Sequence, residues 1–404
     1  MNKTSKIALL ALAGICVSNS GRAAGWQLSD YSMAGLGRAY AGGGVVGDDY
    51  SALAYNPAGM TLSGSGMQVG IAGIHEHADV SAPNYAGRDA STNLDVTVAV
   101  PNFFTQYKLN DKVVIGAGVY VPFGLATQYD KDWEASDHGI KSSLQAIDYT
   151  IGAGIKVTDK LSLGLAAFAR DAKVYLTSTA GNGAGRNKFD LEDWSVGTRV
   201  GVMYELDENT RFGVSYTSRT REEIKGESYL LSGMRGIMDT KLITDAPEYV
   251  QLGAYHKLNS KVALSAGAKW TRWTRFKALT IRPVSEVAQR WENAWTVSVG
   301  ADYFYSEKLT LRAGIGFDES PVPNSRLRTA AIADNDRWEL SLGASYKASD
   351  KTTFDVGYMF LYLPTYTVHN NRADLNGRPG VATPLHAKYR TTAHVLGFQV
   401  QYSF

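Results

Sequence analysis

Residues 112–121 of this chain read Lys-Val-Val-Ile-Gly-Ala-Gly-Val-Tyr-Val. Alternate residues of a β-strand point to opposite faces, so Val113 and Ile115 share one face while Gly116 and Tyr120 share the other. This period of two predicts a strand with one apolar face. The same period recurs at 161–170, 262–270, 295–305, 309–318, 340–346 and 354–360. The chain is therefore predicted to consist mainly of β-strands.

Three features favour strands that cross a membrane over the strands of a soluble sandwich. Many of the strands are about ten residues long or longer, as a tilted bilayer crossing requires. Short polar turns alternate with long polar stretches, an asymmetry typical of bacterial outer-membrane barrels. The long stretches lie near 127–142, 178–189, 221–246, 318–335 and 364–388. The polar faces also carry charged residues in mid-strand, which suits a wet barrel lumen; these are Lys269, Glu292, Arg312, Glu339 and Asp355. We expect an all-β membrane protein in the bacterial outer membrane, an antiparallel transmembrane β-barrel of about 14 strands over residues 66–404.

Aromatic residues near the predicted strand ends are interpreted as girdles at the membrane interfaces. Ordinary strand propensity is the alternative explanation. The aromatic residues concerned are Trp270, Trp273, Trp291, Trp295, Tyr303 and Tyr305. The last strand ends in Phe404, which resembles the signal that outer-membrane proteins present to their assembly machinery. That machinery, outer-membrane lipid and lipopolysaccharide are therefore expected partners.

Residues 1–23 are predicted to be a secretory signal peptide. Lys3 and Lys6 precede an apolar stretch, and small residues follow up to Ala23, which suits cleavage before Ala24. A lipidated Cys16 is the alternative, which Ile15 disfavours because a small residue is wanted there. The mature chain would then lack cysteine, which excludes disulfides and thiolate metal sites. Lys plus Arg (41) nearly balance Asp plus Glu (39), which argues against a nucleic-acid partner.

Residues 24–65 break the strand pattern. The segment is rich in glycine and alanine, yet Trp26, Leu28 and Tyr55 make it too apolar for a disordered tail. Small residues also permit the close backbone packing that a plug inside a barrel needs. A hatch that plugs the lumen is favoured over a periplasmic tail.

Several motifs resemble the long-chain fatty acid transporter family of outer-membrane barrels. Ala24-Gly25-Trp26-Gln27-Leu28, Gly35-Leu36-Gly37-Arg38-Ala39-Tyr40 and Asn56-Pro57-Ala58 resemble its N-terminal hatch. Gly316-Phe317-Asp318-Glu319-Ser320-Pro321-Val322-Pro323 is similar to a later loop-to-strand segment of that family. The resemblance implies a fourteen-stranded barrel plugged by its hatch. It further implies passive passage of fatty acids or hydrocarbons through an apolar site, and a kinked third strand that opens the wall sideways.

Candidate gate and ligand residues follow from this resemblance. Ala24, Gly25, Trp26, Asn56, Pro57 and Ala58 would belong to the hatch, and Pro122, Phe123 and Gly124 to the strand-3 kink. Proline cannot donate to the sheet and glycine weakens it, although a strand ending at the membrane surface would look the same. Arg290, beside Trp291, is the candidate partner for a carboxylate; a solvated loop charge is the alternative. Leu176 stands where the family has a basic residue, so a neutral hydrocarbon remains open as the ligand. Arg170 and Lys173 lie nearby in sequence but on opposite strand faces.

Other chemistries find little support in the sequence. His75-Glu76-His77 invites a metal interpretation, but no third ligand is near in sequence and a strand end explains it. No nucleotide loop or hydrolase triad is recognisable, so neither an enzyme nor a cofactor is expected. A general diffusion porin and an adhesin remain alternatives to the transporter. A monomer is the family expectation.

Overall fold

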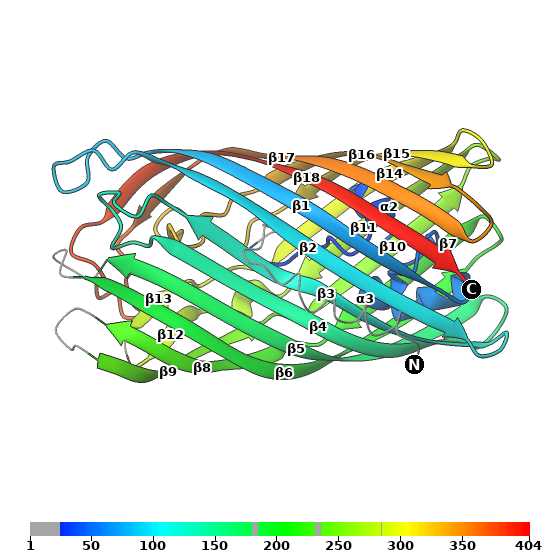
Figure 1. The fold of residues 1–404 in the computed structure, drawn as a ribbon, viewed down its shortest axis with the longest axis horizontal. Helices are drawn as coiled ribbons and strands as arrows, with labels where there is room; N and C mark the ends of the chain where they lie inside the picture. The colour runs from blue at the N-terminus through cyan, green and yellow to red at the C-terminus, as the bar shows by residue number, and fades with distance from the viewer. Residues whose placement is uncertain (1–24, 180–184, 231–235, 284) are drawn as a thin grey trace, which may run out of the picture.

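The strands of this chain form one antiparallel sheet that closes on itself, because β1 pairs with both β2 and β18. The computed structural model describes residues 25–179, 185–230, 236–283 and 285–404 (Figure 1). The strands of the first half are β1 (Gly66–Ser81), β2 (Thr92–Lys108), β3 (Val113–Gln128), β4 (Lys141–Lys156), β5 (Leu161–Thr179), β6 (Arg186–Glu205), β7 (Thr210–Thr217), β8 (Thr220–Leu230) and β9 (Gly236–Ala246). Those of the second half are β10 (Tyr249–Lys257), β11 (Val262–Thr271), β12 (Ala278–Arg282), β13 (Ser285–Ala288), β14 (Ala294–Phe304), β15 (Leu309–Asp318), β16 (Arg337–Lys347), β17 (Thr352–Asn370) and β18 (Leu385–Ser403).

Four of the wall strands are each interrupted and carry two labels. β7 continues as β8, β9 as β10, β11 as β12, and β13 as β14, so the eighteen labelled strands build a barrel of 14 wall strands. The segments β7, β10, β11 and β14 pair with one another, and so do the segments β8, β9, β12 and β13. The predicted antiparallel 14-stranded barrel is confirmed.

Side chains alternate between the two faces of the wall. Along β1 every second residue is buried and the others are exposed or, at His77, half-buried. The outward set is strongly apolar in the middle of the barrel, as in a wall that faces hydrocarbon; it includes Val69, Ile71, Ile151, Leu165, Val196, Val299, Leu342 and Phe398. No helix among the described residues is long and apolar enough to cross a membrane.

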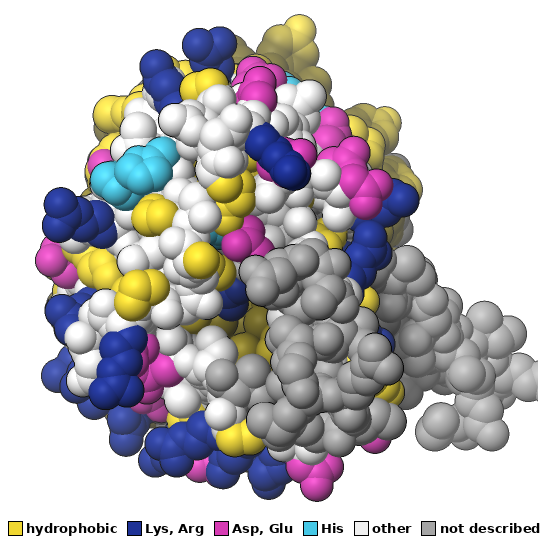
Figure 2. Space-filling view, turned by 90° about the vertical axis from the view of Figure 1, so that its left-hand side faces the viewer, with side chains coloured by type: hydrophobic (Ala, Val, Ile, Leu, Met, Phe, Trp, Pro, Cys, Tyr) yellow, Lys and Arg dark blue, Asp and Glu magenta, His cyan; other side chains and the backbone are white. Residues whose placement is uncertain are grey.

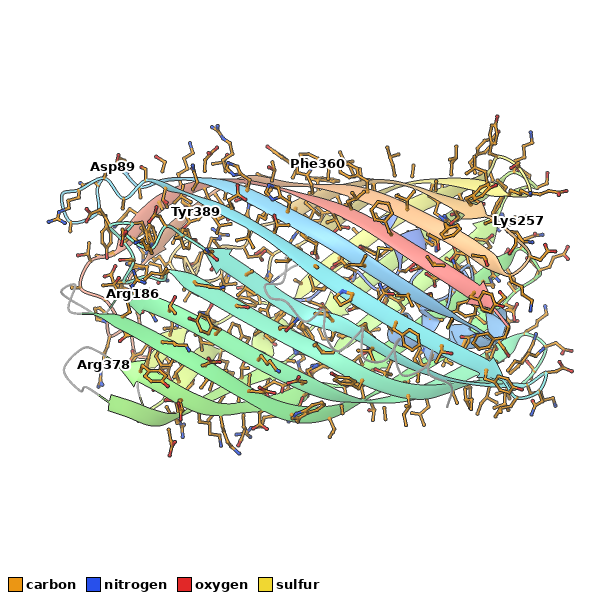
Figure 3. All side chains as sticks on the ribbon, in the orientation of Figure 1. Asp89, Arg186, Lys257, Phe360, Arg378 and Tyr389 are labelled. Carbon is orange, nitrogen blue, oxygen red and sulfur yellow. The ribbon has the colours of Figure 1, made fainter. Side chains whose placement is uncertain are left out.

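The two ends of the barrel differ in their connections. Turns of four residues join the strands at the end that holds Lys257 and the C-terminus, for example 109–112 and 157–160 (Figures 1 and 3). Asp89, Arg186 and Arg378 lie at the opposite end, where the connections include the long stretches 319–336 and 371–384 (Figure 3). Lys, Arg, Asp and Glu side chains surround the rim of this end (Figure 2).

Two details of the strand prediction were wrong. Residues 221–246 were expected to be loop, but they hold β8 and β9, whose inward Ile224 and Leu242 alternate with charged outward residues. Charges on the outward face hid this alternation in the sequence. Glu292 was expected in mid-strand but lies exposed in the break between β13 and β14.

Residues 25–65, called the N-terminal segment below, lie inside the ring of strands. They contain α2 (Met33–Leu36), α3 (Ala52–Tyr55) and the 3-10 helix η1 (Pro57–Leu62). The Met33 amide donates to Gln399 of β18 at 3.1 Å, whereas the Asn56 side chain donates to the Val202 carbonyl of β6 at 3.0 Å. Contacts with such distant strands place the segment across the lumen. Glycine on the wall allows this packing, since a Cβ on Gly164 would lie 2.1 Å from the amide nitrogen of Ala58.

Candidate functional site

The third wall strand leaves the barrel surface halfway along its length. β2 and β3 pair only between Phe103–Lys108 and Val114–Val119, although both strands are fully described and continue well beyond that ladder. The β3–β4 register shifts between Tyr120 and Phe123, where β3 contains one residue more than its partner. From Tyr120 to Thr127 every residue is buried, so this part of β3 no longer alternates between two surfaces. Pro122 has no amide proton to donate to the β2 edge, which explains why the pairing ends here.

The backbone released by this kink bonds to the N-terminal segment instead. The Leu28 amide donates to the Pro122 carbonyl at 2.8 Å, and the Gly124 amide donates to the Trp26 carbonyl at 2.8 Å. Gln27 and Phe123 form an isolated antiparallel bridge between them. The start of the N-terminal segment is therefore a short strand that pairs with the kink.

Five aromatic rings meet at this junction and are called the Trp26 cluster: Trp26, Phe123, Trp273, Phe276 and Trp291. The Trp26 ring centroid lies 5.0 Å from Phe123, 5.2 Å from Trp273 and 6.0 Å from Phe276. Trp291 completes the group, 5.1 Å from Trp273 and 4.7 Å from Phe276. All five rings are buried. Only Trp26 belongs to the N-terminal segment; the other four come from the wall and its breaks.

The breaks in the wall explain why these rings face inward. Trp273 begins the 3-10 turn η3 (Trp273–Arg275) between β11 and β12, and Trp291 lies between β13 and β14. Both were predicted to belong to an interfacial girdle, and that prediction was wrong, because the chain turns into the lumen at these interruptions. Trp295, Tyr303 and Tyr305 from the same prediction are exposed on the outer wall.

One buried cation touches the Trp26 cluster. The guanidinium carbon of Arg170 on β5 lies 4.7 Å from the Phe123 ring centroid. Its nitrogens contact both Asp148 carboxylate oxygens at 2.7 and 2.9 Å, and Glu222 lies 3.7 Å away. A ligand carboxylate would therefore have to compete with two protein carboxylates for this arginine.

A second buried cation is Arg199 of β6. In the part of the chain that the structure describes, its hydrogen-bond partners are all neutral groups. It donates to the hydroxyls of Tyr120 and Tyr249 at 2.9 and 3.1 Å. It also donates to the Thr217 hydroxyl at 2.8 Å and to the Leu53 carbonyl at 3.0 Å. Tyr120 lies directly before the kink, so Arg199 joins the base of the kink to α3 of the N-terminal segment. Neither Arg199 nor its partners formed a recognisable motif in the sequence.

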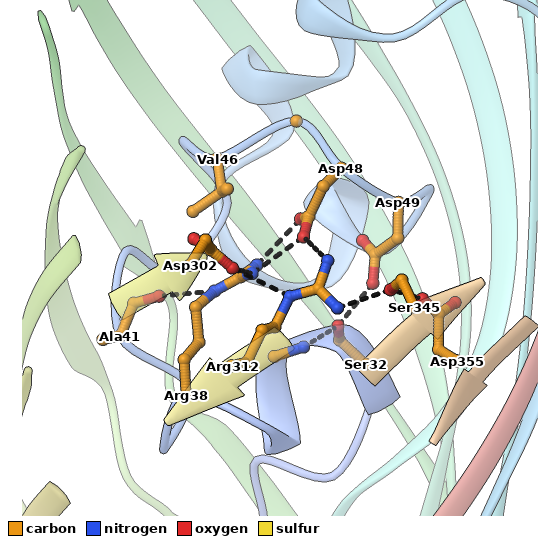
Figure 4. A network of polar contacts seen from close by, with 12 residues as sticks. Ser32, Arg38, Ala41, Val46, Asp48, Asp49, Asp302, Arg312, Ser345 and Asp355 are labelled. Atoms are coloured by element: carbon orange, nitrogen blue, oxygen red, sulfur yellow. Dashed lines mark hydrogen bonds and ion pairs between the residues drawn. The ribbon is translucent and has the colours of Figure 1, made fainter. Parts of the chain in front are cut away.

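A network of ion pairs holds the middle of the N-terminal segment to the wall. Arg38 contacts Asp48 at 2.7 Å and Asp302 of β14 at 3.2 Å, while Arg312 of β15 contacts the same two carboxylates at 2.9 and 2.8 Å (Figure 4). Burial opposes ionisation of Asp48, but the two guanidinium groups outweigh it and hold the pKa of this carboxyl well below its ordinary value. Figure 4 shows Ser345 and Asp355 beside the network, with Ser345 contacting both Arg312 and Asp355. We call these ion pairs the Asp48 network.

Comparison with known proteins identifies the family. The family model described as "Outer membrane protein transport protein (OMPP1/FadL/TodX)" matches residues 14–404. The chain belongs to this family. Members of the OMPP1/FadL/TodX family are outer-membrane transport proteins, so the predicted localisation and the predicted resemblance are both confirmed.

Relatives and solved structures agree with this family. Outer membrane protein P1 of Haemophilus influenzae is 30% identical over 462 residues, which cover 98% of each chain. The long-chain fatty acid transport protein of Escherichia coli K12 is 27% identical over 407 residues, covering 87% of this chain and 91% of that one. A crystal structure of a Pseudomonas aeruginosa FadL homologue superposes with a TM-score of 0.85 at 22% identity, over 94% of this chain and 100% of the other. The Pseudomonas putida toluene transporter TodX shares the fold, with a TM-score of 0.68 at 18% identity over 88% and 94% of the two chains.

The structure brings together only some of the ligand residues predicted for this OMPP1/FadL/TodX member. Phe123 and Trp291 meet in the Trp26 cluster. Leu176 lies half-buried against a neighbouring apolar cluster, which shares Leu144 and Leu279 with the first. Arg290 is not at either cluster: its exposed guanidinium donates to the Leu375 carbonyl at 2.8 Å. Arg170 and Lys173 do lie on opposite faces, as expected, since Lys173 is half exposed and pairs with Asp171 and Glu192.

The predicted hatch residues occupy two separate places. The Gly25 amide donates to Asp334 at 3.1 Å, next to Trp26, whereas Asn56 caps η1, which begins at Pro57. Ala58 is fully buried against Gly164 of β5. Ala24 and the predicted signal peptide lie outside the described residues. The register shift of β3 lies between Tyr120 and Phe123. It therefore contains the predicted kink residue Pro122, ends at Phe123 and directly precedes Gly124.

Proposed function

We propose that this chain carries hydrophobic small molecules passively across the outer membrane, with the N-terminal segment as a hatch and with sideways exit between β2 and β3. The observation that carries the proposal is the kink of β3, whose backbone leaves β2 and pairs with residues 26–28. Because this part of β3 pairs with the hatch and not with β2, a movement of the hatch would change whether the wall is closed between β2 and β3.

The surfaces beside the interrupted ladder suit an apolar solute. Inward-facing Val96, Val98 and Val100 of β2 lie in one hydrophobic cluster with Val121 and Ala126 of β3. A hydrophobic molecule that reaches this cluster keeps apolar contacts until it enters the bilayer. A water-filled pore would instead expose the molecule to water, which is unfavourable for apolar surface. Lateral exit therefore avoids the aqueous step that such solutes cross poorly.

Trp26 is the group that a ligand would replace. It contacts Phe123, Trp273 and Phe276, which belong to the wall and its breaks. An apolar ligand that occupies the Trp26 position gains the same ring contacts and releases residues 26–28 from the kink. Binding and release of the hatch are then one exchange that needs no energy source.

The charges at the Trp26 cluster bear on the ligand's head group. Arg170 already faces Asp148 and Glu222, so a carboxylate gains little there. We propose that the apolar part of the ligand dominates binding and that a carboxylate is tolerated without being required. Long-chain fatty acids, for which the Escherichia coli relative is named, and neutral hydrocarbons are then both substrates.

Deletion of Pro122 tests this proposal. Between the pairs Tyr120–Asp148 and Phe123–Ala146, β3 advances three residues and β4 two, so one deletion restores a regular ladder. A matched control exists in β17, where Pro364 lies in an equivalent irregularity between Leu363 and Tyr366. We expect the Pro122 deletion to abolish uptake of oleate and of a neutral alkane of similar length, and the Pro364 deletion to preserve both.

A binding measurement distinguishes a loss of ligand exit through the wall from a loss of ligand capture. Purified Pro122-deleted protein should still bind oleate within about threefold of the parent protein if the deletion closes only the wall. Unchanged uptake in that variant would refute lateral exit at the kink. Free passage of small sugars through the reconstituted parent protein would favour a diffusion porin instead.

A further inference from the structure

Five of the seven histidines of the chain lie on three neighbouring strands. His75 and His77 belong to β1, His369 to β17, and His386 and His394 to β18, and the pairing order of these strands is β17, β18, β1. All five side chains alternate to the outward face, where His77 is half-buried and the others are exposed. Glu76, between two of them, faces inward and is buried, so the His75-Glu76-His77 motif does not converge.

The strand register places these histidines opposite one another. His369 is the cross-strand partner of His386, and their ring centroids are 3.8 Å apart. His75 is the partner of His394 in the next ladder. We call the five residues the histidine face. In the end-on view, histidine side chains lie together on the rim of the barrel (Figure 2).

The histidine face begins where the apolar outer surface ends. Towards the C-terminal end of the barrel, β1 exposes Val69 and Ile71, and β18 exposes Phe398 and Val400. Towards the end with the long connections, the outward residues are polar from His75 on β1, from His394 on β18 and from Thr365 on β17. In an outer membrane the end with long connections faces outside, so the histidine face, which extends along β18 from His394 to His386, runs from the edge of the apolar surface towards the outer-leaflet head groups. Those head groups belong to lipopolysaccharide, whose lipid anchor carries phosphates.

The other charged residues of this surface nearly cancel. β18 contributes Lys388 and Arg390, while Asp79 on β1 and Asp95 on β2 contribute two carboxylates, and Arg390 is the register partner of Asp79. The surface is therefore close to neutral while the imidazoles are unprotonated. Each imidazole of the histidine face that is protonated in mild acid adds one positive charge to this surface.

The surroundings of the individual imidazoles differ. Asp95 lies 3.7 Å from His75 and 3.5 Å from His77, and Asp79 lies 3.5 Å from His77. His394 shares a hydrogen bond of 2.7 Å with the Tyr358 hydroxyl.

The remaining two histidines face each other, and the cation Arg326 of the 319–336 loop adds to their repulsion. A polyanion would relieve that repulsion when both rings are protonated.

We propose that the histidine face, with Lys388 and Arg390, binds the phosphate groups of lipopolysaccharide and binds them more tightly in mildly acidic medium. Each cation near an anionic lipid surface contributes favourably, so several simultaneous protonations act together. The face would fasten β17, β18 and β1 to the outer leaflet when the surroundings become acidic. This inference is independent of the proposed transport route.

Binding of the full chain in detergent micelles to immobilised lipopolysaccharide, at pH 5.5 and pH 7.5, tests the proposal. We expect at least tenfold tighter binding at pH 5.5. Replacing all five histidines by glutamine should remove this ratio and leave the affinity at pH 7.5 within about twofold. His256→Gln is the matched control, because His256 is exposed on β10, away from the face, and should keep the full ratio.

Two further arms identify the ligand. Lipopolysaccharide without its phosphates should bind with no pH dependence, and millimolar inorganic phosphate should not displace the intact lipid. Equal affinity at both pH values would overturn the proposal, and so would a persistent ratio in the five-glutamine variant or displacement by free phosphate. If that variant does not insert, His369→Gln with His386→Gln should at least halve the ratio, and an unchanged ratio would overturn the proposal equally.

Discussion

Replacing Trp26 by alanine should release the start of the N-terminal segment from the kinked strand. The Trp26 side chain is 3% exposed, and its ring contacts three others at 5.0–6.0 Å. Truncation of a buried tryptophan costs about 3–5 kcal/mol. The two backbone hydrogen bonds to Pro122 and Gly124 that remain contribute about 1 kcal/mol each. The released state should therefore become roughly 100–4000 times more populated, since each 1.4 kcal/mol is a factor of ten.

Hydrogen exchange measures this release directly. The amides of Leu28 and Gly124 are the donors of the two bonds, so peptides that cover 25–30 and 119–126 should lose protection by that factor. Trp133→Ala is the matched control, because Trp133 is equally buried but lies in the external connection between β3 and β4. Unchanged protection of both peptides in the Trp26 variant would refute the inference that this ring anchors the segment. Equal loss in the Trp133 variant would show general loosening instead.

Three smaller predictions concern the lumen and the ligand site. Asp48→Asn leaves Arg38 and Arg312 with one carboxylate between them and should lower the temperature at which the barrel unfolds on a gel, reflecting a loss of about 1.5–3 kcal/mol; an unchanged temperature contradicts a structural role for the network. Gly37→Ala would place a Cβ 2.8 Å from the Gly343 backbone and should cost about 1–3 kcal/mol by the same assay, whereas Gly64→Ala, with open space around it, should be neutral. Arg290→Ala should change oleate affinity by less than about twofold because this residue is exposed and solvated, but Trp291→Ala should weaken oleate and alkane alike; selective loss of oleate in the arginine variant would restore Arg290 as a carboxylate partner.

The strands were predictable because their signal is local. Most wall strands repeat with a period of two, and the lumen residues Arg312, Glu339 and Asp355 are buried where the alternation places them. Apolar residues occupy the opposite, outward face, so the residue composition and the period of two both indicate strands of a membrane barrel. The pattern failed at 221–246, where both strands lie towards the end with the long connections (Figure 1) and most of their outward residues are charged.

The candidate site was only partly predictable because it is assembled across the barrel. Trp26, Phe123 and Trp291 are far apart in sequence and meet through the kink and through breaks in other strands. Nothing local shows that Trp291 turns inward while Trp295, four residues later, points to lipid. Arg199 was missed for the same reason, since its partners come from separate elements.

The distribution of anchoring within the N-terminal segment bears on which part of it would move under the proposed function. Its middle is held by the Asp48 network, in which two buried arginines share two carboxylates, and separating those charges in the lumen would leave each of them desolvated. Its start is held by the Trp26 ring and by hydrogen bonds: the two backbone bonds to β3, the bond from the Gly25 amide to Asp334, and the bond from the Thr271 hydroxyl to Gln27. An apolar ligand can replace the contacts of Trp26 but offers nothing to Arg38 or Arg312. Under the proposed function, release of the start alone would therefore be the low-energy motion, and it would free the kink of β3.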